Sequence, residues 1–470
     1  MRKTKIVCTI GPASNNKETL IRMCKAGMNV ARLNFSHGTH QEHQKNIDLI
    51  KEVREELNLP IAILLDTKGP EYRIGIFEKD KIFLNDGDTF TFTTDDVTGN
   101  QERVSVSYKG LTRDIEKGDR ILLNNGLVIL DVTDIKGNDV VCRVVTGGEV
   151  SNRKSMSFPN KVLKQVYLSD QDKNDLLFGI KNDVDFIACS FVSNKQDMLD
   201  VKNFLKENGN PNVELIAKIE NQSGIDNIEE ICEECSGIMI GRGDMGVEIA
   251  YEKLPAIQKH LITKCRMLGR RVITATEMLE SMINNPRPTR AEISDVANAV
   301  YDGSSAIMLS GETAAGKYPA EAVEAMAKIT FETEQNIHYE KRFKNYSFKI
   351  KNAIDAISHA TCGMAIDLNA SGIVVCSHSG MTARMVSRFR SPVDIIGLTS
   401  QEGVWRKLAL SWGVTPVLTD AYPSTDVLFY VAKNTAKEVF GLESGNCVII
   451  TGGATNGESG NTDLIKIEKI

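Results

Sequence analysis

The chain lacks any long run of apolar residues. Although 41% of its 470 residues are hydrophobic, no run approaches the roughly 20 residues that a membrane-spanning helix needs. The first residues, MRKTKIVCTIGPAS, hold too short an apolar run for a secretory signal, and no small-residue cleavage site follows. We therefore expect a first strand here, and a cytoplasmic protein without a membrane partner.

Blocks of lysine and arginine are missing as well. The 56 basic residues are outnumbered by 62 acidic ones, which gives a net charge of −6. This balance argues against a nucleic-acid partner, because nucleic acids select for basic patches. The sequence also contains no low-complexity tract, and its composition is that of an ordinary globular protein.

The ten cysteines show neither a disulfide pattern nor a zinc pattern. Several, such as Cys8 and Cys189, lie within apolar runs, as buried free thiols do. Cys232 and Cys235 form a single CxxC within an expected helix, without a second pair or clustered histidines. We therefore predict no zinc site, and the free thiols fit the reducing cytoplasm.

What the sequence does contain is a regular alternation of strand and helix patterns. Eight short apolar runs have continuous rather than alternating hydrophobicity, which is typical of strands buried on both faces. Eight strand–helix units predict a closed (β/α)8 TIM barrel of the α/β class. The expected strands are Lys5–Ile10, Asn29–Asn34, Ile61–Asp66, Asp185–Phe191, Glu214–Ile219, Gly237–Ile240, Arg271–Thr276 and Ala306–Leu309. The expected helices are Lys17–Lys25, His40–Leu57, Ser169–Lys181, Lys195–Asn208, Gly224–Cys235, Tyr251–Leu268, Thr289–Tyr301 and Pro319–Thr333.

The interval between Asp66 and Ser169 breaks this rhythm. Short β-branched runs separated by Gly and Asp turns predict an all-β domain inserted after the third barrel strand, where it can act as a lid. Beyond the charged segment Glu334–Lys351, strands and helices alternate again and predict a doubly wound α/β domain. We place the barrel at 1–69 and 168–340, the inserted domain at 70–167 and the C-terminal domain at 341–470.

Two neighbouring strand-like runs each end in charged residues. The first ends in Lys218 and Glu220, and the second in Arg242 and Asp244. Because ligands bind beyond the carboxyl ends of barrel strands, we expect Glu220, Asp244 and Lys218 to share one cleft. Two carboxylates suit Mg²⁺ or Mn²⁺, and a neighbouring lysine suits a substrate that develops negative charge. An ordinary solvated loop start gives the same pattern, so the other strand ends must decide.

Those strand ends carry nine motifs in order: TIGPAS, ARLNFSHG, LLDTKGPE, AKIEN, GRGDMGVE, ITATEMLESM, PRPTRAE, DVANAVYDG and MLSGETAAGKYP. Their order and spacing closely resemble those of the pyruvate kinase family, and the resemblance covers essentially the whole chain. It implies the same three-part architecture. It also implies the reaction, which is transfer of the phosphoryl group of phosphoenolpyruvate to ADP to give pyruvate and ATP in the last step of glycolysis.

The resemblance implies roles for the charged residues. Glu220 and Asp244 resemble the family's divalent-metal ligands, which hold Mg²⁺ or Mn²⁺ against the substrate's carboxylate and enol oxygen. Arg32, Arg73 and Lys218 would surround the phosphoryl group and offset its charge. The implied substrate contacts are Arg32, Lys218, Gly243, Asp244 and Thr276.

A monovalent-cation site is implied at the ends of the second and third strands. Asn34, Ser36, Asp66 and the carbonyl of Thr67 offer only oxygen ligands, and by resemblance they hold K⁺. In this family a glutamate at the position of Glu71 accompanies K⁺ dependence, whereas a lysine there substitutes for the charge of the ion. The resemblance therefore predicts an enzyme that needs K⁺.

Further implied roles concern the proton and the nucleotide. By resemblance the hydroxyl of Thr276 lies near the methylene carbon that is protonated, and Ser310 and Glu312 pass a proton to that carbon through water. Lys218 is not expected to be the proton donor. The implied nucleotide-binding residues are Asn34, His37, Arg73 and the lid lysine, Lys154.

The C-terminal domain carries a segment with different chemistry. The segment joins a strand to a helix, where hydroxyls and free N–H groups make an anion site, although an ordinary capped helix has the same pattern. It resembles the family's allosteric sugar-phosphate pocket, which the glycine-rich loop 452–460 would close. A sugar phosphate and AMP both remain open as effectors, and the family suggests a homotetramer. The implied effector residues are Ser377, His378, Ser379, Gly380 and Thr382.

Several positions depart from the family pattern. Glu277 stands where glutamine is usual and adds negative charge beside the site. In the lid, the turn 124–126 reads Asn-Asn-Gly instead of Asp-Asp-Gly, and 154–160 reads KSMSFPN instead of KGVNLPG. Gly241 replaces an alanine, which we expect to loosen its loop, and Ser193 replaces a frequent arginine. Since no metal or phosphoryl contact is lost, we expect an effect on turnover or nucleotide preference.

Two other interpretations remain open. A metal-dependent lyase or aldolase acting on pyruvate enolates would share Glu220 and Asp244, but it would need neither a nucleotide lid nor Glu71. A slow or non-catalytic paralog that senses sugar phosphates would account for the lid departures, but the retained Lys218 and Thr276 oppose it.

Overall fold

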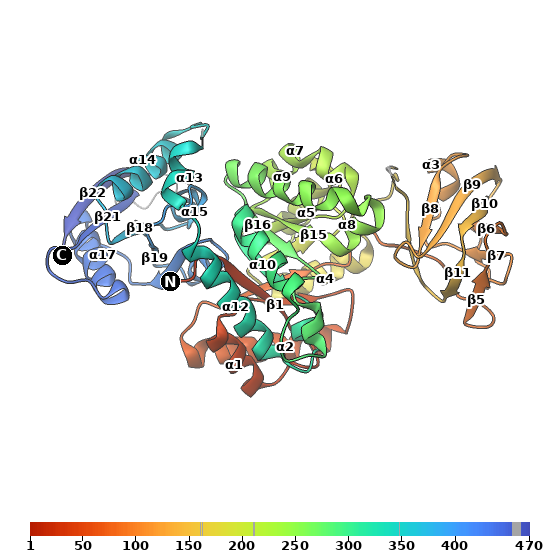
Figure 1. Cartoon of the computed structure of the whole chain (residues 1–470), viewed down its shortest axis with the longest axis horizontal. Helices are drawn as coiled ribbons and strands as arrows, with labels where there is room; N and C mark the ends of the chain where they lie inside the picture. The colour runs from red at the N-terminus through yellow and green to blue at the C-terminus, as the bar shows by residue number, and fades with distance from the viewer. Residues whose placement is uncertain (160, 162, 210–211, 347, 454–461) are drawn as a thin grey trace.

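The chain is arranged as three units side by side. The computed structural model describes residues 1–159, 161, 163–209, 212–346, 348–453 and 462–470. The barrel lies in the middle, with a β-rich unit on one side and an α/β unit on the other (Figure 1). Each unit has a hydrophobic core of its own. The predicted three-part architecture is therefore confirmed, while the domain boundaries drawn from the sequence stay predictions.

Eight parallel strands close the central barrel in the order β1-β17-β16-β15-β14-β13-β3-β2. All eight agree with the expected strands to within two residues at either end, and nearly every residue in them is buried. Burial on both faces explains their continuous hydrophobicity. The strands are β1 (Lys5–Thr9), β2 (Val30–Asn34), β3 (Ala62–Asp66), β13 (Phe186–Cys189), β14 (Glu214–Ile219), β15 (Gly237–Gly241), β16 (Arg271–Ala275) and β17 (Ala306–Leu309).

Side-chain caps set where the barrel helices begin. Thr39, Ser169, Asn194 and Thr289 each form a reciprocal capping box with the third residue of the helix that follows. Among the described residues, no helix is both long and apolar enough to cross a membrane. The helices around the barrel are α1 (Lys17–Ala26), α2 (His40–Leu57), α4 (Asp170–Lys181), α5 (Lys195–Glu207), α6 (Gln222–Asp226), α7 (Ile228–Glu234), α9 (Leu254–Met267), α10 (Arg290–Asp302) and α12 (Pro319–Gln335).

The helix expected at Gly224–Cys235 is instead two helices, α6 and α7. Asn221 caps α6 by accepting a hydrogen bond from the N–H of Gly224. Asn227 ends α6, and its amide donates to the carbonyl of Ser193 at 2.9 Å, which breaks the helical run. Two short helices, η2 (Glu280–Ile283) and α11 (Gly311–Ala314), were not expected from the sequence, because a single turn has no periodicity to detect. Helix α8 (Arg242–Glu248) opens at the segment Gly241–Asp244, and η1 (Tyr251–Lys253) is the start of the helix expected at Tyr251–Leu268.

The β-rich unit is the lid expected after β3. Its main sheet has the order β4-β12-β8-β9-β10-β6-β7, and β11 pairs with β5 beside it. Phe90 and Phe92 are fully buried in its core. The strands are β4 (Tyr72–Arg73), β5 (Lys81–Leu84), β6 (Thr89–Thr93), β7 (Arg103–Ser105), β8 (Arg120–Leu123), β9 (Val128–Lys136), β10 (Asp139–Thr146), β11 (Gly148–Ser151) and β12 (Ser155–Ser157), with α3 at Leu111–Asp114. Three of them, β4, β11 and β12, were not expected, because they lack the β-branched runs that marked the other strands.

The C-terminal unit is the doubly wound domain that was predicted. Its sheet has the order β20-β19-β18-β21-β22, and only β22 runs antiparallel to its neighbour. Residues of α14, α15 and α16 pack on one face of this sheet and residues of α17 on the other. The elements are α13 (Tyr339–Asn345), α14 (Ala353–Asp367), β18 (Gly372–Cys376), α15 (Met381–Arg388), β19 (Ile395–Thr399), α16 (Glu402–Leu408), β20 (Val414–Leu418), α17 (Thr425–Phe440), β21 (Cys447–Gly453) and β22 (Thr462–Lys469).

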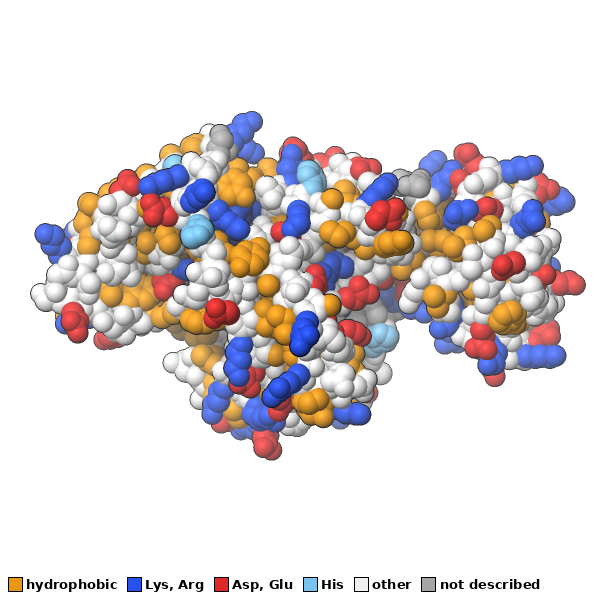
Figure 2. Space-filling model, viewed as in Figure 1, with side chains coloured by type: hydrophobic (Ala, Val, Ile, Leu, Met, Phe, Trp, Pro, Cys, Tyr) orange, Lys and Arg blue, Asp and Glu red, His pale blue; other side chains and the backbone are white. Residues whose placement is uncertain are grey.

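A buried ion pair joins the C-terminal unit to the barrel. Arg406 Nε lies 2.6 Å from Oδ1 of Asp185, whose side chain is fully buried. The other carboxylate oxygen of Asp185 accepts a hydrogen bond from the N–H of Ile63 at 2.9 Å. The junction therefore depends on a paired, desolvated charge. On the face shown in Figure 2, by contrast, acidic and basic side chains are interspersed over the surface.

We predict that Asp185→Ala destabilises the barrel–C-terminal junction by about 3 kcal/mol, because it removes the buried partner of Arg406 and leaves only Asp183, a largely exposed carboxylate 2.8 Å from Nη2. Calorimetry should show a clear fall in the melting temperature of this part of the chain. The exposed pair Lys81–Glu149 in the lid, 2.7 Å apart, provides the control. Lys81→Ala should cost less than about 1 kcal/mol. Equal effects of the two substitutions would contradict the prediction.

Candidate active site

Four charged side chains from neighbouring strand ends form a buried network at the carboxyl end of the barrel. Lys218 Nζ, on β14, lies 3.1 Å from Asp66 Oδ1 and 3.0 Å from Glu220 Oε1. Arg32 Nε, on β2, lies 2.6 Å from Asp66 Oδ2. All four residues are at least nine-tenths buried. The barrel thus brings together four residues that the sequence placed on three separate strand ends.

Strand β13 completes this network with two groups that the sequence analysis did not identify. Lys218 Nζ donates to the hydroxyl of Ser190 at 2.7 Å, and that hydroxyl donates to the carbonyl of Thr67 at 2.6 Å. The N–H of Phe191 donates to Glu220 Oε2 at 2.9 Å. Ser190 follows directly on β13, so the strand-end position that singled out Glu220 was also the available signal for Ser190.

The network sets the charge state of its members. Burial opposes the charged form of Lys218, but Asp66 and Glu220 outweigh burial and raise the pKa of the lysine. Burial alone would raise the pKa of Asp66, yet Arg32 and Lys218 hold that pKa below its usual value. The lysine therefore remains an ammonium group, which suits electrostatic stabilisation and does not suit proton abstraction.

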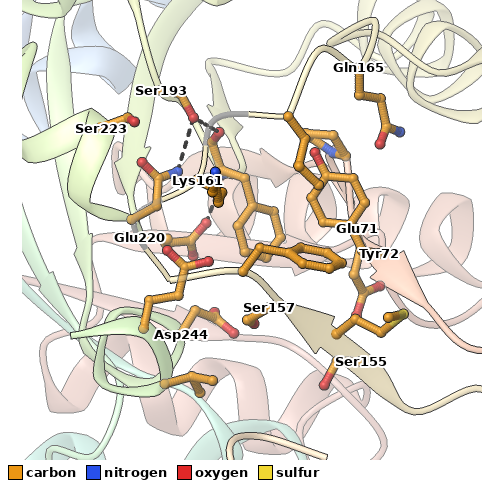
Figure 3. Close-up of a pocket in the computed structure, with 18 of the residues that line it drawn as sticks. Glu71, Tyr72, Ser155, Ser157, Lys161, Gln165, Ser193, Glu220, Ser223 and Asp244 are labelled. Carbon is orange, nitrogen blue, oxygen red and sulfur yellow. Dashed lines mark hydrogen bonds between the residues drawn. The ribbon is translucent and has the colours of Figure 1, made fainter. Parts of the chain in front are cut away.

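Glu220 is the exception within the network. Burial and the neighbouring charge of Asp244 raise the pKa of Glu220 to about 7, despite Lys218. Glu220 and Asp244 both line a cavity of about 530 Å³, and Figure 3 shows them on the same side of it. Among the described residues, no three His, Cys, Asp or Glu side chains are grouped to hold a metal ion. Two carboxylates completed by substrate oxygens nevertheless fit Mg²⁺ or Mn²⁺, whose charge would relieve the repulsion.

Gly241 packs directly against the side chain of Glu220. It is the last residue of β15 and is buried, so it lies in the strand and not in the following loop, where we expected it to add freedom. An ideal Cβ on Gly241 would come 2.7 Å from Glu220 Oε1. The missing side chain therefore gives the carboxylate of Glu220 its space.

The lid forms the opposite wall of the cavity. Arg73 and Lys154 line it, and Arg73 Nη2 pairs with Glu71 Oε1 at 2.5 Å. Figure 3 shows Glu71, with other lid residues, facing Glu220 and Asp244 across the cavity. Arg73 thus joins the cavity wall and not the buried network. The last residue of the variant lid segment 154–160 lies outside the described residues.

The lid turn 124–126 has a left-handed backbone conformation. Asn124, Asn125 and Gly126 have consecutive φ values of 52°, 58° and 79°, a left-handed turn that asparagine and glycine tolerate best.

Gly69, which we call the hinge because the chain enters the lid there, has a φ of 68°, and its N–H donates to Asp172 Oδ1 at 3.0 Å. A side chain on Gly69 would come 2.8 Å from Ser190, so the hinge is packed tightly against the buried network.

The candidate proton-handling residues lie at the ends of β16 and β17. The hydroxyl of Thr276 accepts a hydrogen bond from the N–H of Gly243 at 2.9 Å. Among the described residues, the buried Ser310 Oγ has no hydrogen-bond partner. The carboxylate of Glu312 accepts from the N–H groups of Leu279 and Ser310 at 2.9 and 2.7 Å. Glu312 thus holds the local backbone, whereas the Ser310 hydroxyl is left unpaired by the described residues.

The candidate K⁺ ligands lie on the β2 and β3 ends. Asn34 Oδ1 accepts from the N–H of Ser36 at 3.1 Å, and Ser36 and His37 are exposed. Asp66 and the Thr67 carbonyl already accept hydrogen bonds from the buried network, but carboxylate and carbonyl oxygens have further lone pairs. The set consists only of oxygen donors, which fits a hard monovalent cation.

The candidate effector residues lie in the C-terminal unit, on the far side of the barrel from the lid (Figure 1). Gly380 precedes α15 with a φ of 76°, and the Thr382 hydroxyl lies 2.6 Å from the hydroxyl of Thr462. Ser377, His378 and Ser379 occupy the loop from β18 to α15. Of the glycine-rich loop 452–460, residues 454–460 lie outside the described residues.

We predict that divalent-metal binding weakens as the pH falls from 8 to 6. Below a pKa of about 7, a proton occupies Glu220 and competes with the metal, so affinity should drop by about tenfold per pH unit. Electron paramagnetic resonance of free Mn²⁺ measures this directly. Glu248, whose pKa burial also raises to about 7, supplies the control, because Glu248→Gln should keep the pH dependence. Constant affinity over this range would contradict the assignment of Glu220.

The chain matches known proteins along its whole length. The family models "Pyruvate kinase, barrel domain" and "Pyruvate kinase, alpha/beta domain" match residues 1–323 and 355–468. A pyruvate kinase of Clostridium acetobutylicum is 46% identical over 472 aligned residues, covering 100% of both chains. One from Staphylococcus aureus is 46% identical, covering 100% of this chain and 81% of its own.

A solved structure agrees with these sequence matches. The crystal structure of a pyruvate kinase from Cryptosporidium parvum superposes with a TM-score of 0.95 at 39% identity, covering 100% of this chain and 96% of that one. The agreement includes the barrel whose strand ends carry the buried network. The chain belongs to the pyruvate kinase family of phosphotransferases.

Proposed function

We propose that the cavity between barrel and lid transfers the phosphoryl group of phosphoenolpyruvate to ADP, giving pyruvate and ATP. The observation that carries this proposal is the buried ammonium of Lys218, which lies 3.0 Å from Glu220 at the carboxyl end of the barrel. Phosphoryl transfer is catalysed mainly by positioning and charge stabilisation. A permanently charged lysine beside two carboxylates supplies both.

Glu220 and Asp244 would hold Mg²⁺ or Mn²⁺, which when bound supplies charge stabilisation for the enol oxygen. Arg32 and Lys218 would bind the phosphoryl oxygens from the barrel side, and Arg73 from the lid side. At the start of α8, the N–H of Asp244 would take the substrate carboxylate, and Gly243, whose own N–H donates to the Thr276 hydroxyl, would lie beside it. This arrangement holds the phosphoryl group between barrel and lid, where water is excluded.

The proton for the methylene carbon would arrive on the β16–β17 side. Thr276 would lie beside that carbon, and the unpartnered hydroxyl of Ser310 would bind the water that delivers the proton. Glu312 would orient Ser310 through the hydrogen bond that it accepts from the Ser310 N–H.

The remaining proposals concern the nucleotide, K⁺ and regulation. Lys154, His37, Asn34 and Arg73 would bind the nucleotide. K⁺ would be held by Asn34, Ser36, Asp66 and the Thr67 carbonyl, and would offset the negative charge of Glu71. The loop from β18 to α15 would bind a sugar phosphate or AMP, in a cytoplasmic homotetramer.

We expect pyruvate formation from phosphoenolpyruvate, ADP and Mg²⁺ to depend on K⁺. In a coupled assay, replacing K⁺ by a bulky monovalent cation should remove most of the activity. Glu71→Lys should restore activity without K⁺, because its ammonium supplies the missing charge. Full wild-type activity without K⁺ would refute the ion site but not the reaction, and no turnover in either salt would refute the reaction.

We also expect Lys218→Met to lower kcat by at least about 10²–10³-fold, the typical loss when a preorganised charge is removed from a transition state. Lys5 provides a matched control, because it is a buried lysine at the opposite end of barrel strand β1 and donates to the carbonyl of Val414. Lys5→Met should keep kcat within about threefold, since it touches no substrate. Retained activity in Lys218→Met would overturn the role of this lysine.

A further inference from the structure

The turn after β16 has an unfavourable backbone conformation. Thr276 and Glu277 have φ values of 69° and 54°, in the left-handed region. Neither is glycine, and threonine is β-branched, so this backbone conformation is unfavourable for both residues. Such a conformation persists only where surrounding groups hold it. The groups that hold this turn therefore also fix Thr276, which is a candidate residue of the reacting centre.

Arg242 supplies the contacts. Its Nε and Nη2 donate to the carbonyl of Thr276 at 3.2 and 2.5 Å, and Nη2 also donates to the carbonyl of Glu277 at 3.0 Å. The opposite edge of the guanidinium is fixed by Asp295 on α10, whose two carboxylate oxygens lie 2.9 and 2.8 Å from Nη1. One planar guanidinium therefore joins α10 to both carbonyls of the strained turn.

The same turn is tied to the start of α8. The hydroxyl of Thr276 donates to the carbonyl of Ala275 at 2.6 Å and accepts from the N–H of Gly243 at 2.9 Å. Gly243 lies between Arg242 and the candidate metal ligand Asp244. Helix α8 has no side-chain cap at Gly241, and the Thr276 hydroxyl instead accepts the N–H of Gly243.

We propose that Arg242, oriented by Asp295, is a positioning residue for the proton-transfer half of the reaction. It keeps the Thr276–Glu277 turn in its left-handed conformation and so places the Thr276 hydroxyl beside Gly243 and Asp244. The inference rests on the proposed function and deepens it, because neither Arg242 nor Asp295 needs to touch the substrate. Lysine cannot replace this arginine, since an ammonium lacks the planar fork that reaches two carbonyls and a carboxylate together.

A positioning role predicts a specific kinetic pattern. Arg242→Lys should lower kcat by about tenfold or more, because small misplacements of a reacting group are costly. The KM for phosphoenolpyruvate and the affinity for Mn²⁺ should change by less than about threefold. Exchange of the pyruvate methyl protons for solvent deuterium, followed by NMR in the presence of ATP and Mg²⁺, should fall at least as much as kcat. Asp295→Asn should reproduce the pattern more weakly.

A double-mutant cycle with Thr276→Ala decides between positioning and a purely structural role. If Arg242 acts through Thr276, Arg242→Lys should slow the Thr276→Ala enzyme by less than about twofold. Independent, multiplicative losses would overturn the proposal, as would loss of kcat in strict proportion to the fraction unfolded. If Arg242→Lys does not fold, the same cycle with Asp295→Asn gives the same decision.

The lid offers a matched control for the arginine–aspartate chemistry. Arg120 Nε and Nη2 lie 2.8 and 3.3 Å from the two carboxylate oxygens of Asp131, on an exposed part of the sheet. Arg120→Lys should leave kcat and deuterium exchange unchanged. Absence of turnover in the wild-type protein would refute the proposed function itself, whereas an active wild type with an additive cycle would refute only the role of Arg242.

Discussion

The structure of the site depends on one buried ammonium group. Lys218 lies between Asp66 and Glu220, and the three side chains are nearly inaccessible to solvent. An uncompensated carboxylate at this depth would be costly, so each charge is tolerated only because the others are present. The β13 end reinforces the arrangement through Ser190. The barrel supplies the geometry, because four parallel strands bring their carboxyl ends to one place.

Much of this fold could be predicted from the sequence. The barrel strands are buried on both faces, so their apolar runs are continuous and easy to detect, and all eight lie where expected. The doubly wound domain was predictable for the same reason. Elements of one turn or two residues, such as α11 and β4, were not, because neither helical nor strand periodicity can be recognised over so short a span.

The site residues also differ in whether the sequence could identify them. Glu220, Asp244 and Lys218 could be selected because charged residues directly after apolar runs stand out in the sequence. Ser190 occupies an equivalent position, but a serine there has an obvious role as a loop residue, and only the 2.7 Å contact with Lys218 shows otherwise. The left-handed conformation of Thr276 was beyond prediction, since it is imposed by contacts with Arg242 and not by local preference.

A short, tightly packed segment joins barrel strand β3 to the lid. The N–H of Gly69 donates a hydrogen bond to Asp172, and Gly69 packs against Ser190. It lies close in the sequence to Asp66 and Thr67. The chain that enters the lid is therefore the chain that carries the oxygens proposed for K⁺. A rotation of the lid about Gly69 would therefore move the Thr67 carbonyl much less than the lid residues that line the cavity. The proposed K⁺ site and the lid are thus connected through one short, tightly packed segment.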